Sequence, residues 1–107
     1  MQRKLRFTPT AHEQLSRIEA DPTLAGVLKQ VRKTLGYLET NIFSKSLQTH
    51  KYDSLSIRYK REVFEAYAQQ HTPGAYRVYW YYGPDEVAKN GKRTAIITII
   101  FITPHPE

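Results

Sequence analysis

The run TAIITIIFIT, residues 94–103, constrains the fold more than any other stretch of the sequence. It is rich in β-branched residues, and apolar residues occupy both its odd and its even positions. This pattern is typical of a strand that is buried on both faces. The chain is therefore predicted to form a sheet in which this strand lies centrally.

Other segments supply candidate partners for that strand. KLRF (residues 4–7) alternates basic and apolar residues, as a short edge strand does. Three more segments predict strands, and the joins HTPG and GPDEVAKNGK carry the Pro, Gly and Asn that turns need. These strands are KSLQTHKY (45–52), EVFEAYAQ (62–69) and AYRVYWYY (75–82). Both joins are short enough for antiparallel hairpins.

Two helices are predicted between the first strand and the rest. Thr8 before Pro9 reads as an N-cap, and Thr10 with Glu13 offers an alternative start as a capping box. Asp21 before Pro22 starts a second helix, whose leucines and valines keep a helical period over about four turns. The segment SLSIRYKR (54–61) is interpreted as a basic loop or strand end.

The predicted order is thus a strand, a two-helix hairpin, and a mainly antiparallel sheet of three or four strands with the helices on one face. This is an α+β fold, and 107 residues suit one domain spanning residues 1–107. No apolar run reaches the length of a membrane span, and MQRKLRF lacks the apolar core of a signal peptide. We therefore expect a cytoplasmic protein without a membrane partner.

The composition restricts the chemistry. The chain has no cysteine, which excludes a disulfide scaffold and thiolate chemistry. Its histidines show no metal-binding spacing, so neither a metal nor a cofactor is predicted; they are His12, His50, His71 and His105. A formal net charge of +6 favours a polyanionic partner, either nucleic acid or an acidic protein.

Arg77 is the unusual residue of the predicted strand AYRVYWYY, where four tyrosines and a tryptophan surround it. Side chains alternate across a strand, so Arg77 shares one face with Tyr79 and Tyr81, and Val78 and Trp80 point towards the helices. An arginine beside tyrosines suits unstacked nucleic acid, because guanidinium binds phosphate and rings stack on bases. The alternative is a solvated face on which Arg77 pairs with a glutamate such as Glu65.

Other candidates are more weakly supported. Basic or hydrogen-bonding side chains that could line a positive groove, or simply keep the surface soluble, come from THKYDS and RYKR: His50, Lys51, Tyr52, Arg58, Lys60 and Arg61. His105 lies between two prolines after the last predicted strand. An imidazole held there could act as a general acid or base near neutral pH, or it could have a structural role only.

The order of elements and several motifs resemble the RelE/ParE superfamily of bacterial toxins over most of the chain. The resemblance rests on the helix hairpin, on SLQTH, on AYRVYWYY and on the final IITIIFITPHP. It implies a toxin of a type II toxin-antitoxin pair, bound and covered by a cognate antitoxin as a hetero-oligomer. RelE-like members cut messenger RNA in the ribosomal A site by attack of a ribose 2′-hydroxyl on the adjacent phosphate. ParE-like members inhibit DNA gyrase, and a third reading is a non-catalytic domain that only binds an antitoxin.

The resemblance also implies roles for particular residues. Arg77 matches the arginine that stabilises the phosphate transition state, and His105 lies near an acid/base position, from which it could protonate the leaving oxygen. Lys51, with His50 beside it, falls near the basic positions after the helices, and either could take the proton of the 2′-hydroxyl. The chain departs from the family after its final strand, where HPE stands in place of an arginine or tyrosine. That function is then either missing or supplied from elsewhere, for instance by Tyr79 or Tyr81.

Overall fold

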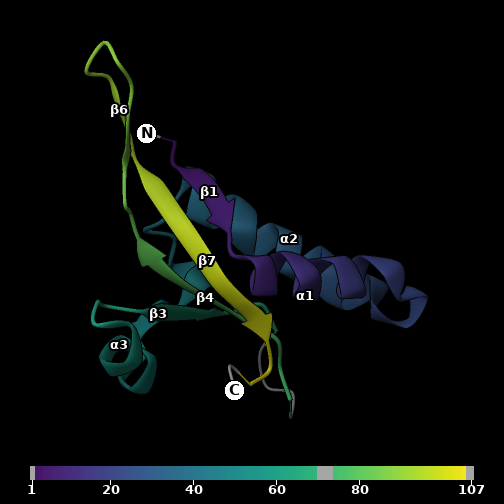
Figure 1. The fold of residues 1–107 in the computed structure, drawn as a ribbon. Helices are drawn as coiled ribbons and strands as arrows, with labels where there is room; N and C mark the ends of the chain where they lie inside the picture. The colour runs from purple at the N-terminus through teal and green to yellow at the C-terminus, as the bar shows by residue number, and fades with distance from the viewer. Residues whose placement is uncertain (1, 70–73, 106–107) are drawn as a thin grey trace.

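Five strands form one mixed sheet in the computed structural model, which describes residues 2–69 and 74–105 (Figure 1). Across the sheet the order is β1 (Lys4–Phe7), β7 (Ile96–Thr103), β4 (Arg77–Tyr82), β3 (Phe64–Tyr67) and β2 (His50–Lys51). Strand β1 runs parallel to β7, and the other neighbouring strands are antiparallel. The predicted α+β class is confirmed. Strand β7 is an interior strand as expected, but β4 occupies the centre.

The helix hairpin begins where the sequence indicates. Helix α1 (Pro9–Ala20) uses the first of its two predicted starts, because the Thr8 side chain accepts a hydrogen bond from the Ala11 N–H. Asp21 caps a short 3₁₀ turn, η1 (Pro22–Leu24), and α2 (Ala25–Thr40) follows directly. The two helices lie side by side along one face of the sheet (Figure 1).

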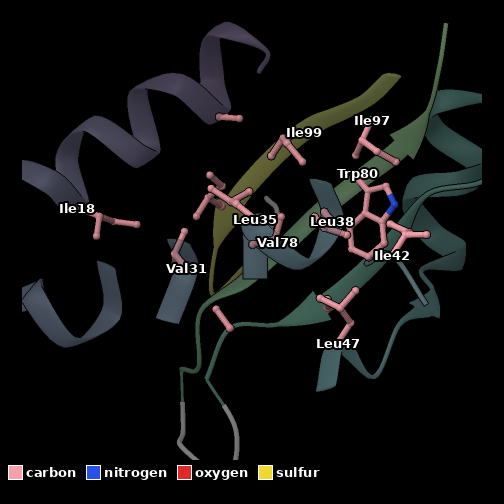
Figure 2. Close-up of a cluster of buried hydrophobic side chains, with 14 residues drawn as sticks. Ile18, Val31, Leu35, Leu38, Ile42, Leu47, Val78, Trp80, Ile97 and Ile99 are labelled. Atoms are coloured by element: carbon pink, nitrogen blue, oxygen red, sulfur yellow. The ribbon is translucent and has the colours of Figure 1, made fainter. Parts of the chain in front are cut away.

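The main core lies between this hairpin and the sheet. Val78 and Trp80 of β4 are fully buried there, which confirms the face predicted for them. Figure 2 shows Trp80 beside Leu38 and Ile42. The remaining labelled members of this cluster are Ile18, Val31, Leu35, Leu47, Ile97 and Ile99.

A third helix corrects the prediction for residues 54–61. Helix α3 (Asp53–Tyr59) forms where a basic loop or strand end was expected. Its Leu55 is buried against Tyr79 and Ile100 in a second, smaller cluster. Because Tyr79 points to the opposite side of β4 from Val78 and Trp80, this helix packs on the second face. The expectation that the helices cover one face only was therefore wrong.

Two predicted segments are more irregular than expected. KSLQTHKY yields a 3₁₀ turn, η2 (Lys45–Leu47), and only the two-residue strand β2. The predicted turn of residues 83–92 widens into a hairpin of β5 (Glu86–Val87) and β6 (Arg93–Thr94), which projects away from the sheet (Figure 1). Most of the predicted HTPG turn lies outside the described residues. None of the described helices is long and apolar enough to cross a membrane.

Candidate functional site

The Arg77 cluster is a group of polar and aromatic side chains on the sheet face opposite α1 and α2. Strand register brings its members together, because Glu65 pairs with both His50 and Tyr79, and Tyr67 pairs with Arg77. Side chains directly opposite each other on neighbouring strands lie within contact distance. We use the name for His50, Glu65, Tyr67, Arg77 and Tyr79.

Glu65 is the buried centre of the cluster, with only 4% of its side chain exposed. Its Oε1 contacts Nε2 of His50, and its Oε2 lies 3.6 Å from an Nη atom of Arg77. A buried carboxylate is costly unless cations or hydrogen-bond donors compensate it. Glu65 is thus held between two basic side chains that remain partly exposed. The pairing of Arg77 with Glu65 that the sequence suggested as an alternative is confirmed.

The two nitrogens of His50 both face oxygen atoms. Nδ1 lies 2.9 Å from the carbonyl oxygen of Gln48, which can only accept, so Nδ1 carries a hydrogen. Nε2 meets the carboxyl group of Glu65, and a hydrogen bond there requires one further proton, on the imidazole or on the carboxyl. The His50–Glu65 contact lies next to the surface, because 49% of the His50 side chain is exposed.

Arg77 is fixed on three sides. Its guanidinium carbon lies 4.7 Å from the centre of the Tyr67 ring, and its Nη1 is 3.5 Å from the Tyr79 hydroxyl. Burial lowers the pKa of Arg77, but the Tyr79 hydroxyl and the nearby Glu65 outweigh it, so the net shift of the pKa is upward. The side chain is 27% exposed, and its buried Nε has no hydrogen-bond partner among the described residues. The charged guanidinium is therefore only partly covered by the protein.

Tyr79 differs from its predicted role. Its side chain is fully buried, with edge-to-face contacts to Tyr52 at 5.3 Å and to Phe101 at 6.3 Å between ring centres. Burial raises the pKa of the Tyr79 hydroxyl, and the Arg77 hydrogen bond only partly opposes this. No base can stack on a ring enclosed in this way. The Tyr79 hydroxyl instead contacts Arg77 from the interior of the protein. Tyr81 is half-buried, and the guanidinium of Arg61 lies 4.4 Å from its ring centre.

The other predicted residues lie apart from the cluster or at its rim. Lys51 follows His50 on β2 and so points to the opposite side of the strand, where its Nζ is 3.9 Å from Glu62. The exposed basic residues at the end of α3 are Arg58, Lys60 and Arg61. His105 is exposed and follows by two residues Thr103, which pairs with Arg77 across β4 and β7. The structure thus connects His50 to Arg77 through Glu65. His105 follows β7 just beyond the end of β4 at which Arg77 lies.

Sequence reasoning missed Tyr67 and named Glu65 only as an ion-pair partner. The signal was present in EVFEAYAQ, where Glu65 and Tyr67 alternate with Phe64, Ala66 and Ala68. An acidic side chain two residues from an aromatic one lies on the same face of a strand. Where the other face of that strand is apolar, this pattern indicates a paired charge.

Within residues 2–69 and 74–105, no group of three His, Cys, Asp or Glu side chains is arranged to hold a metal ion. Comparisons with known protein families, with curated proteins and with solved structures found no match. The candidate site therefore rests on its geometry: a cationic guanidinium and an imidazole, both partly exposed, and a buried carboxylate that contacts both.

Proposed function

We propose that this chain is the toxin of a type II toxin-antitoxin pair with a RelE/ParE-like fold, and that it cuts messenger RNA on the ribosome. One observation carries the proposal: Arg77 and His50 converge on the buried Glu65 at a partly exposed face of the sheet. The order of β1, a helix hairpin and antiparallel strands agrees with the resemblance seen in the sequence. A cognate antitoxin would cover this face.

In the proposed reaction, Arg77 binds the scissile phosphate. Guanidinium forms paired hydrogen bonds with phosphate oxygens, and it stabilises the added negative charge when the 2′-hydroxyl attacks. Glu65 and Tyr67 fix the orientation of the fork before substrate arrives, because they contact it from within the protein. This preorganisation lowers the barrier without any movement of the side chain during the reaction.

Two proton transfers complete the cleavage, and His105 and His50 each carry out one of them. His105, exposed two residues beyond the end of β7, takes the proton of the 2′-hydroxyl. The His50–Glu65 pair gives its shared proton to the 5′-oxygen that leaves. The products are a cyclic phosphate and a free 5′-hydroxyl, so the atoms and charges balance. Lys51 has no part in this scheme, since it points to the other side of β2.

The decisive experiment is controlled expression in bacteria of the wild type and of Arg77→Ala, followed by mapping of messenger RNA 5′ ends. We expect growth arrest with new cuts in translated messages for the wild type, and a loss of cleavage of about 10²–10³-fold in Arg77→Ala. Arg77→Lys keeps a positive charge beside Glu65 but lacks the planar fork, so it should remain folded and still lose most cleavage. Arg17→Ala, on α1, is the matched control and should cut normally.

Two results would contradict the proposal. Undiminished cleavage by both Arg77 variants would remove Arg77 from the chemistry. Growth arrest by the wild type without any new RNA ends would favour the ParE-like alternative, and inhibition of gyrase would then be measured. Circular dichroism of each purified variant separates loss of activity from loss of folding.

A further inference from the structure

A polar groove of about 580 Å³ adjoins the Arg77 cluster, between α2, the η2 turn and the end of β3. Its lining is dominated by amides, hydroxyls and one lysine rather than by aliphatic side chains. The lining residues able to contact a ligand through amide, ammonium or aromatic groups include Gln30, Lys33, Tyr37, Gln48 and Tyr67. The scheme proposed for RNA cleavage leaves this groove unused.

The groove adjoins the Arg77 cluster through one shared residue, Tyr67, and through Gln48, which contacts His50. Tyr67 lines the groove, and its ring lies 4.7 Å from the guanidinium carbon of Arg77. Gln48 also lines it, and the Gln48 carbonyl oxygen lies 2.9 Å from Nδ1 of His50. The groove therefore adjoins Arg77 on the side of the Tyr67 ring, where it is open to a group attached by one ribose to a phosphate on Arg77.

The groove exists because β2 stops early. Strand β2 pairs with β3 only at Phe64 and Glu65, and β3 continues to Tyr67 without a neighbour on that side among the described residues. The Ala68 N–H bonds to Tyr76 on the β4 side. By strand alternation, the backbone N–H and C=O of Tyr67 are directed towards the groove. The groove thus offers main-chain donors and acceptors as well as side chains.

We propose that this groove binds the base of the nucleotide next to the phosphate held by Arg77, and so sets the base preference of cleavage. The inference rests on the proposed function and deepens it. Amide side chains such as those of Gln30 and Gln48 match the donor and acceptor edges of a base. Tyr37 and Tyr67 offer ring faces or edges for stacking, and Lys33 lies where it can attract the adjoining backbone phosphate.

Charge and lining together favour RNA over a peptide as the occupant. The chain carries a net charge of +6, and the described residues that line the groove include a lysine but no acidic residue. The unpaired stretch of β3 is too short to add a long peptide strand by main-chain bonding alone. An apolar helix would find few apolar contacts here. An unstacked nucleotide meets all three features: amides, ring faces and positive charge.

The test compares the double variant Gln30→Leu/Lys33→Met with Lys29→Met, an exposed lysine of α2 that does not line the groove. Binding is measured by fluorescence anisotropy with short single-stranded RNAs whose 2′-hydroxyls are methylated, so that they cannot be cut. We expect the double variant to bind about tenfold more weakly, from the loss of one base contact and one phosphate contact. Lys29→Met should bind like the wild type apart from a small salt-dependent loss.

Cleavage by the same variants gives the second measurement. We expect the double variant to cut with a flattened distribution of bases at the position beside the scissile bond, and the control to keep the wild-type distribution. If the wild type cuts RNA and the double variant matches Lys29→Met in both measurements, the groove inference is overturned and the proposed function stands. If the wild type neither binds nor cuts RNA, the proposed function fails and the inference with it. A double variant that loses only neutralisation by its antitoxin would also overturn the inference, because the groove would then dock protein.

Discussion

The two faces of the central strand β4 obey different physical rules. Towards α1 and α2 the strand presents Val78 and Trp80, both fully buried among aliphatic side chains. Towards α3 it presents Arg77, Tyr79 and Tyr81, and Arg77 there meets the buried Glu65. The first face stabilises the fold by removing apolar surface from water. The second face places charges where desolvation opposes them.

This difference shows which face is free to carry a function. Replacing a buried ion pair with apolar residues of similar size is often neutral or stabilising, so stability alone does not require Glu65 opposite Arg77. Helix α3 covers only part of this face, through Leu55 and Tyr79, and leaves Arg77 and His50 partly exposed. A small domain can keep a costly charged site because its other face supplies the larger apolar core.

The largest loss of stability should come from a substitution on the face of β4 that packs against α1 and α2. We expect Trp80→Ala to lower the free energy of unfolding by about 3–5 kcal/mol, because it leaves a cavity beside Leu38 and Ile97. Chemical denaturation followed by circular dichroism measures the change. Tyr82→Ala is the control, since that aromatic side chain is 44% exposed and should cost far less. Equal losses for the two variants would show that Trp80 is not the centre of the core.

The charged face should respond in a non-additive way. Glu65→Met alone leaves Arg77 and His50 facing an apolar group, and we expect a loss of about 1–3 kcal/mol. In Glu65→Met with Arg77→Met the Arg77 guanidinium is no longer left without its carboxylate partner, and the double variant should be more stable than the sum of the two single variants predicts. The measurement is a double-mutant cycle by denaturant unfolding. Strict additivity would mean that Glu65 and Arg77 are not energetically coupled and that the two faces of β4 differ less in their energetics.

The sequence predicted the first face well and the second face poorly, for physical reasons. Proline, threonine caps and hydrophobic periods are local signals, and they located α1, the start of the hairpin and the inward side of Trp80. Helix α3 spans only residues 53–59, which is too short for its period to stand out, and its Ile57 and Tyr59 suit a strand equally well.

The candidate site was predicted in part. Strand alternation placed Arg77 on the face opposite α1 and α2, and a partner such as Glu65 was anticipated. The contact between His50 and Glu65 depends on the pairing of β2 with β3, which involves only two residues of β2. It also depends on the preceding turn, in which Gln48 has a left-handed backbone at φ 45°. Such a register has no local sequence signal. The burial of Tyr79 likewise follows from α3, and it was missed for the same reason.

The smallest expected effect is a pH dependence of stability that arises from Tyr79 on one face of β4 and not from Tyr82 on the other. Burial raises the pKa of Tyr79 in the folded state above the value of about 10 for an exposed tyrosine. Between the unfolded and folded pKa values the unfolded chain releases a proton that the folded chain retains, so stability falls as the pH rises above about 10. Below that pH the contribution is constant. We expect the wild type to lose roughly 1 kcal/mol more than Tyr79→Phe between pH 10 and pH 11, at up to about 1.4 kcal/mol per pH unit. Tyr82→Phe, on an exposed tyrosine of the other face, should titrate like the wild type. Parallel stability curves for the wild type and Tyr79→Phe across this pH range would show that the Tyr79 hydroxyl reaches solvent, and the enclosed support proposed for Arg77 would have to be abandoned.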